Sequence, residues 1–113
     1  ALNNLAWLYS NKGDRRALEV GKQAYQLATT EPAIIDTYGW ILVKAGETEQ
    51  ATRILKQAVE LAPDNQEIVY HLGYALHAQG RREEARNVLQ RALDLDRESK
   101  LAADARKLLQ EVE

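Results

Sequence analysis

Asp36-Thr-Tyr-Gly-Trp-Ile-Leu42 decides the fold, because a related stretch, Tyr70-His-Leu-Gly-Tyr-Ala-Leu76, follows it later in the chain. When the second stretch and the residues after it are aligned with the first without gaps, seven positions are identical: Gly39/Gly73, Leu42/Leu76, Gly46/Gly80, Ala51/Ala85, Leu55/Leu89, Ala58/Ala92 and Leu61/Leu95. A third copy lies upstream, carried by Ala6, Trp7, Gly13, Ala17, Ala24 and Leu27, and its turn after Gly13 is slightly shorter. The chain is therefore a repeat array, and this period decides the reading of everything else.

Each copy is predicted to be two helices separated by a glycine. In residues 34–44 and 49–61, small and apolar residues recur at three- and four-residue steps, as one face of a helix requires. Gly46 and Gly80 lie where one helix must end and the chain reverse, a position that favours a left-handed backbone. Helix starts are predicted at a set of capping residues, namely Asp14, Thr30 before Pro32, Asp64 or Asn65, and Ser99.

Small residues at equivalent positions of every copy predict closely packed helix pairs. They are Ala6, Gly39 and Gly73 on the first helices and Ala17, Ala51 and Ala85 on the second. Without bulk on either side, the helix axes can approach to the near end of the usual ~8–10 Å range. A lone hairpin would still expose an apolar face, so neighbouring hairpins are expected to stack and bury it.

These residues resemble the tetratricopeptide repeat family. Its small first-helix residue, turn glycine, spaced alanines and closing proline match Gly39, Gly46, Ala51, Ala58 and Pro63, and all but the proline recur in the next copy. The sequence departs from the pattern locally: Thr29 and Arg97 replace the closing proline, and Gly21 replaces the leucine seen as Leu55 and Leu89. Gly21 should cost about 1 kcal/mol relative to alanine, so the first hairpin is expected to be the least stable.

The resemblance implies an all-α, right-handed superhelix of three helical hairpins with a C-terminal capping helix. The expected repeats span about 1–29, 30–63 and 64–97, and the capping helix spans 98–113. In that last segment Leu101, Ala105, Leu108 and Val112 form one apolar stripe, as a terminal helix with a polar outer face requires. No such cap precedes residue 1, and the chain lacks methionine, so we expect the C-terminal fragment of a longer repeat protein.

Composition argues against several other classes of protein. The 15 basic and 17 acidic residues are scattered, and no basic block marks a nucleic-acid binder. The longest apolar run, residues 38–43, is too short to span a membrane. Cysteine is absent, which excludes thiolate metal sites. His71 and His77 fall on different helix faces and are predicted to be ordinary surface or groove histidines, so we expect no metal, no cofactor and no catalysis.

The family resemblance implies a concave groove lined by the first helix of each hairpin. By helical phase, the residues expected to project into it are Asn3, Trp7, Asn11, Asp36, Trp40, Lys44, Tyr70, Tyr74 and His77. Trp7, Trp40 and Tyr74 are equivalent, and we call them the aromatic ladder. The ladder is interpreted either as a binding surface, since aromatic residues dominate binding hot spots, or as packing between repeats. Asp36 and Tyr70 are predicted to share a hydrogen bond between neighbouring repeats.

The leading functional hypothesis is a scaffold that binds a protein or peptide partner in the groove. One alternative is self-assembly, in which the uncapped first hairpin stacks onto another chain as a homo-oligomer. Another is a regulatory segment of a larger protein. The family's chaperone-tail clamp is disfavoured, because Trp7, Glu67 and His71 stand where it needs asparagine, lysine and arginine. Residues 2–75 resemble bacterial repeat lipoproteins of exopolysaccharide export and protein sorting, which favours the periplasm over the cytoplasm.

Overall fold

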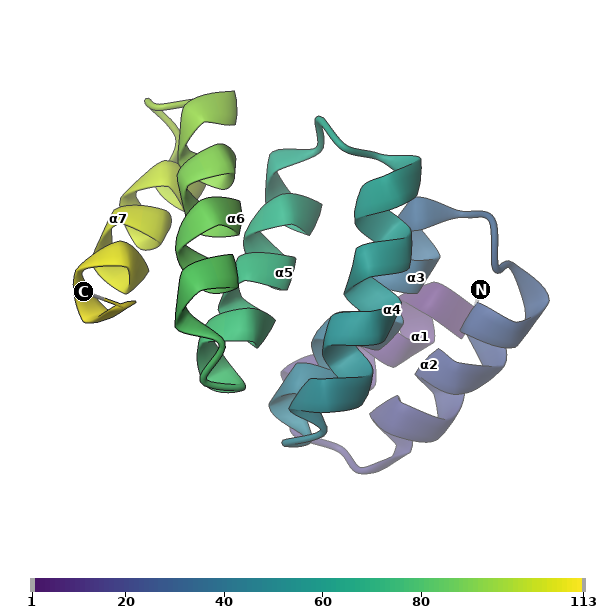
Figure 1. Cartoon of the computed structure of the whole chain (residues 1–113). Helices are drawn as coiled ribbons and strands as arrows, with labels where there is room; N and C mark the ends of the chain where they lie inside the picture. Colours follow the sequence, from purple (N-terminus) through teal and green to yellow (C-terminus); the bar gives the residue numbers. More distant parts are fainter. Residues whose placement is uncertain (1, 113) are drawn as a thin grey trace.

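Residues 2–112 are described by a computed structural model and form seven helices, with no strand among them. The helices are α1 (Leu2–Asn11), α2 (Arg16–Leu27), α3 (Pro32–Lys44), α4 (Thr48–Leu61), α5 (Gln66–Ala78), α6 (Arg82–Leu95) and α7 (Lys100–Val112). Consecutive helices pack as the hairpins α1/α2, α3/α4 and α5/α6, and α7 packs against both α5 and α6 (Figure 1). The predicted all-α repeat solenoid is confirmed.

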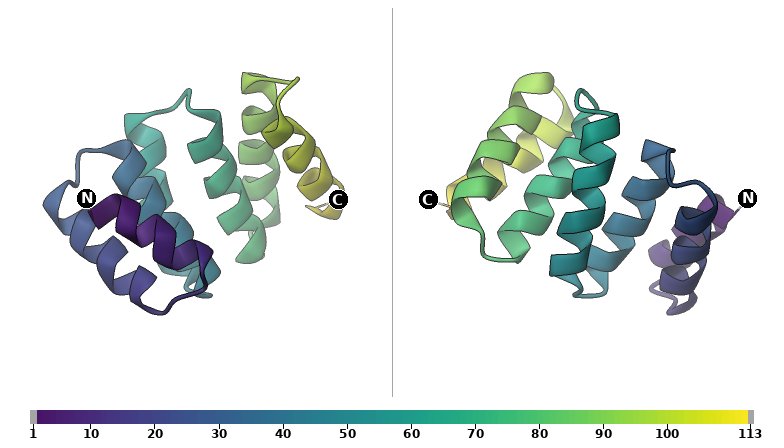
Figure 2. Two further views of the ribbon diagram at one scale, coloured as in Figure 1. Left: turned by 180° about the vertical axis from the view of Figure 1, so that it is seen from behind. Right: turned by 45° about the vertical axis from the view of Figure 1, so that its right-hand side comes forward.

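The first helices of the hairpins form one layer of the solenoid and the second helices form the other. Helix α3 contacts both α1 and α5, and α5 contacts α7, so the first helices and α7 lie in series. The second helices α4 and α6 face the viewer in Figure 1, and the left view of Figure 2, seen from behind, brings α1 forward. This arrangement presents equivalent residues of successive repeats on one continuous surface.

The turns within the hairpins are made by the three glycines that share one position of the repeat. Gly13, Gly46 and Gly80 have φ values of 68°, 83° and 84°, and no other described residue has a positive φ. The predicted left-handed backbone at the hairpin turns is therefore confirmed.

The helix pairs pack through one small and one large residue, and the first hairpin uses a different combination. A Cβ added to Gly39 would lie 2.6 Å from Leu55, and one added to Gly73 would lie 2.7 Å from Leu89, so a side chain at either position would displace the leucine. In the first hairpin Ala6 faces Gly21, and the Cδ1 of Ile41 reaches to 3.1 Å from the place of a Gly21 Cβ. An isoleucine from the next hairpin thus fills the space that a leucine fills elsewhere.

Two of the predicted helix caps are confirmed, one lies a residue away from the cap position, and one is wrong. The Asn65 side chain accepts the backbone N–H of Ile68 at 3.1 Å, and Ser99 Oγ accepts that of Ala102 at 3.0 Å. Asp14 Oδ1 accepts the N–H of Arg16 at 2.9 Å, but α2 begins after Arg15, so Asp14 precedes the cap position by one residue. Helix α3, by contrast, begins after Glu31, whose side chain makes no cap bond, so Thr30 is not the cap. Pro32 explains this start, because it presets the helical φ and has no N–H to satisfy.

The last helix buries a slightly different stripe from the predicted one. Ala102, Ala105 and Val112 are buried against α5 and α6, whereas Leu101 and Leu108 are only half-buried. The predicted stripe missed Ala102, because two neighbouring helices cover a broader arc of α7 than a single seam would. No helix among residues 2–112 is long and apolar enough to cross a membrane.

Candidate binding surface on the first helices

The structure places most of the predicted groove residues at the surface of α1, α3 and α5. Asn11 and Lys44 are exposed, and six others are half-buried: Asn3, Trp7, Trp40, Tyr70, Tyr74 and His77. Asp36 is the exception, since it is only 3% exposed. The other predicted residues therefore have some contact with solvent, and Asp36 belongs to the interior.

Four rings from α3 and α5 gather into what we call the aromatic cluster: Trp40, Tyr70, His71 and Tyr74. The Trp40 and His71 rings stack with centroids 4.2 Å apart and planes 19° apart. Tyr74 meets Trp40 edge-on at 5.0 Å and lies 6.3 Å from Tyr70. The cluster joins two successive repeats, yet three of its rings remain partly open to solvent.

His71 of this cluster forms a buried pair with Asp36, which corrects two predictions. His71 Nδ1 lies 2.8 Å from Asp36 Oδ1, with side chains only 8% and 5% exposed. His71 is thus not a surface or groove histidine, and Asp36 bonds to His71 rather than to Tyr70. With Asp36 as a carboxylate, which only accepts hydrogen bonds, the donor in this contact is the Nδ1–H tautomer of His71.

The pair holds neighbouring repeats together instead of offering chemistry to a substrate. Its His71 ring is covered by Trp40, and His71 and Asp36 are both buried. A buried polar group needs its partner, since an orphaned one costs about 1–3 kcal/mol. Within residues 2–112 no group of three or more histidine and carboxylate side chains is arranged to hold a metal ion.

The aromatic ladder is continuous over two of its three members. Trp40 and Tyr74 touch, whereas Trp7 makes no ring contact with another aromatic residue of the described chain. Beside Trp40 on α3, Lys44 Nζ lies 5.9 Å from the Trp40 ring centroid. The Oδ1 of Asn3 is buried and has no hydrogen-bond partner within residues 2–112.

The other end of the surface is completed by α7, which sequence reasoning did not include. His77 Nε2 of α5 lies 3.3 Å from Glu111 Oε1 of α7. Burial raises the pKa of Tyr70 to about 12, and the negative charges of Asp104 and Glu111 add to the effect. The sequence could have predicted this part of the surface, because Asp104 and Glu111 occupy in α7 the repeat positions that Tyr70 and His77 occupy in α5.

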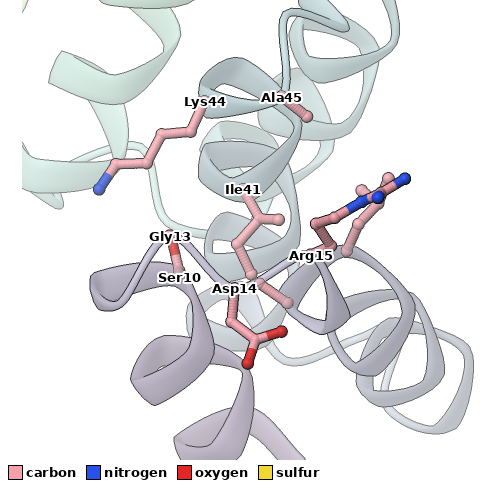
Figure 3. Close-up of a pocket in the computed structure, with 9 residues that line it drawn as sticks. Ser10, Gly13, Asp14, Arg15, Ile41, Lys44 and Ala45 are labelled. Atoms are coloured by element: carbon pink, nitrogen blue, oxygen red, sulfur yellow. The ribbon is translucent and has the colours of Figure 1, made fainter.

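A hollow of about 490 Å³ lies at the junction of the first two hairpins, between the α1–α2 turn and the end of α3, and Lys44 is part of its lining. Figure 3 shows the charged ends of Asp14, Arg15 and Lys44 pointing in different directions around it. Polar groups that diverge cannot grip one small ligand, so the partly open aromatic surface is the better candidate site.

Comparison with known proteins identifies the family. The model of the tetratricopeptide repeat matches residues 42–109, more than half of the chain, and the chain belongs to this family. No curated protein sequence matches it.

Solved structures share the fold at low sequence identity. The second repeat domain of human RPAP3, in complex with the HSP70 peptide SGPTIEEVD, is 18% identical with a TM-score of 0.86, covering 98% of this chain and 91% of that one. YrrB, a repeat protein with an unusual peptide-binding site, is 21% identical with a TM-score of 0.85, covering 94% and 55%. A mutant O-GlcNAc transferase of Thermobaculum terrenum is 25% identical with a TM-score of 0.86, covering 98% and only 21%. The fold thus occurs in peptide-binding domains and in a segment of an enzyme.

Proposed function

We propose that the chain is a protein-interaction scaffold that binds a peptide or partner protein along its first helices, without catalysing a reaction. The observation that carries this proposal is the aromatic cluster, whose Trp40, Tyr70 and Tyr74 stay half-exposed at the centre of a continuous surface. Aromatic side chains supply large contact area at low entropic cost and dominate binding hot spots. The similar human domain is known with a peptide bound, which supports a peptide as the occupant.

The test is selection of peptide binders from a displayed library, followed by affinity measurement on variants. Changing Trp7, Trp40 and Tyr74 together to alanine should weaken the selected peptides at least tenfold. The matched control changes two leucines of the second helices to alanine: Leu27, 79% exposed, and Leu61, 50% exposed. Circular dichroism must show that both variants remain folded. Equal binding by wild type and the aromatic variant would refute the proposed surface.

Self-assembly through the first hairpin is the second candidate function. Leu8 is 48% exposed and Leu27 is 79% exposed, and both belong to this hairpin. Large apolar side chains exposed on one hairpin favour stacking of another copy against it. Light scattering across a wide concentration range tests this alternative: a growing mass that Leu8→Glu abolishes would support it, and a constant monomer mass would exclude it.

A further inference from the structure

We infer that the occupant of this surface is an extended peptide carrying an arginine or lysine, whose cationic group lies against Tyr70 and Tyr74 between the carboxylates of Asp104 and Glu111. The inference rests on the proposed function and adds the chemical class of the partner. It concerns the end of the surface formed by α5 and α7, which contact each other along the solenoid (Figures 1 and 2).

On the aromatic side of the site, part of the Tyr70 and Tyr74 ring surface is exposed to solvent. The Tyr70 and Tyr74 centroids lie 6.3 Å apart with planes inclined by 58°, and both side chains are only half-buried. Inclined rings present π faces to a ligand placed beside them, and a π face attracts a cation electrostatically. The molecule already shows this preference twice: Arg16 Cζ lies 4.4 Å from the Tyr9 ring centroid, and Lys44 Nζ lies 5.9 Å from the Trp40 ring centroid.

The charged side of the site carries two carboxylates that form one ionisable contact between them within residues 2–112. Asp104 has no ion pair there, and the only ionisable partner of Glu111 is His77, at 3.3 Å. Burial is the main cause of the raised pKa of Tyr70, and the negative charges of Asp104 and Glu111 disfavour its ionisation further. Their fields therefore converge at the tyrosine that would form the floor of the site.

The exposed cations of α7 form no ion pair with Asp104 or Glu111 within residues 2–112. Arg106 donates to the backbone carbonyl of Arg97, at the opposite end of the helix from Glu111. Lys107 lies three residues after Asp104 and four before Glu111, yet its exposed side chain pairs with neither within the described chain. A cation supplied by a partner would thus meet two carboxylates and two aromatic rings at once.

The same charges argue against an acidic tail of the kind bound by the similar human domain. Its peptide, SGPTIEEVD, carries two glutamates and a final aspartate. On this chain such a tail would meet Asp104 and Glu111, with Glu67 exposed in the first turn of α5. Like charges brought together at an interface suppress the wrong partner, so the surface selects for positive charge.

Two libraries of displayed nine-residue peptides test the inference. They are identical except that the central residue is arginine in one and glutamate in the other. The arginine library should yield the tighter binders, and Asp104→Asn with Glu111→Gln should weaken them about threefold to tenfold, the range expected for losing two partly exposed ion pairs. Raising the salt concentration should weaken wild-type binding and leave the doubly neutralised variant almost unaffected.

The matched control removes the same charge from the second helices. Glu60→Gln with Glu83→Gln changes two exposed side chains of α4 and α6 that form no ion pair in the described chain. These changes should leave affinity for the arginine peptides unchanged, since the charges lie in the other layer.

The outcomes separate the inference from the proposed function. Binders that depend on Trp40 and Tyr74 but prefer glutamate, or that ignore Asp104 and Glu111, would overturn the cationic partner while leaving the scaffold intact. If neither library yields a peptide that depends on the aromatic residues, the proposed function fails and the inference fails with it.

Discussion

Replacing both members of the buried Asp36–His71 pair should destabilise the protein less than replacing His71 alone. His71→Phe keeps a ring to stack on Trp40 but leaves the Asp36 carboxylate, 5% exposed, without its partner. Breaking a buried pair by removing one member typically costs about 3–5 kcal/mol, because the other charge stays buried and uncompensated. We therefore expect His71→Phe to remove about that much of the free energy of unfolding.

The second single variant and the double variant complete the cycle. Asp36→Leu keeps the branched shape of the side chain and orphans only the His71 N–H, for about 1–3 kcal/mol. In the double variant both positions are apolar and no buried group lacks a partner, so its loss should stay within about 2 kcal/mol of wild type. The two single losses should thus exceed the double loss by about 2 kcal/mol or more.

Urea unfolding followed by circular dichroism at 25 °C measures all four proteins, and an unchanged slope certifies the comparison. Asp36→Asn serves as the conservative control, since its amide oxygen can still accept the hydrogen bond from His71. Losses that add to within about 0.5 kcal/mol would refute the reasoning, because independent sites behave in that way. The 2.8 Å contact between His71 Nδ1 and Asp36 Oδ1 would then contribute little to the free energy of unfolding.

Three further predictions concern packing, capping and pH. Gly39→Ala should cost about 1–3 kcal/mol in urea unfolding despite its better helix propensity, because its Cβ would lie 2.6 Å from Leu55; a stabilised variant would contradict this. Asn65→Ala should lower the melting temperature through loss of a cap worth about 0.5–2 kcal/mol, whereas Thr30→Ala should change little, and equal effects would dismiss the assigned caps. Because folding raises the pKa of Tyr70 from 10.0 to about 12, its contribution is complete below pH 10 and is lost as the pH rises towards 12. Tyr70→Phe should accordingly flatten the loss of stability seen in urea midpoints measured from pH 9 to 12, and an unchanged profile would count against it.

The fold could be predicted from the sequence because its determinants repeat. Helical periodicity, turn glycines and the pairing of Gly39 with Leu55 are local patterns, and each occurs again at the same position of the next repeat. The first hairpin broke the pattern at Gly21, and sequence reasoning treated this as a weakness alone. The compensation comes from Ile41 in the next hairpin, which no pattern within one repeat reveals.

The site was less predictable because it depends on how neighbouring helices pack and on the rotation of each helix about its own axis. Helical phase correctly placed Trp40 and Tyr74 on one surface, but it could not show that His71, next to Tyr70 in sequence, turns inward. Pairing of Asp36 with Tyr70 or with His71 differs by about 100° of helix rotation. Only the packed geometry of α3 against α5 decides between them.

The aromatic ladder places an aromatic residue at the same position of three repeats, and packing explains only part of it. Trp40 and Tyr74 contact each other, and Trp40 also stacks on His71 of the buried pair, so packing explains why both positions are aromatic. Trp7 makes no such ring contact within the described chain, although it is the third member of the same position. Packing therefore accounts for two residues of the ladder, whereas the proposed binding would account for all three. This is why the effect of Trp7 on affinity, more than that of its neighbours, bears on whether the ladder is a binding surface.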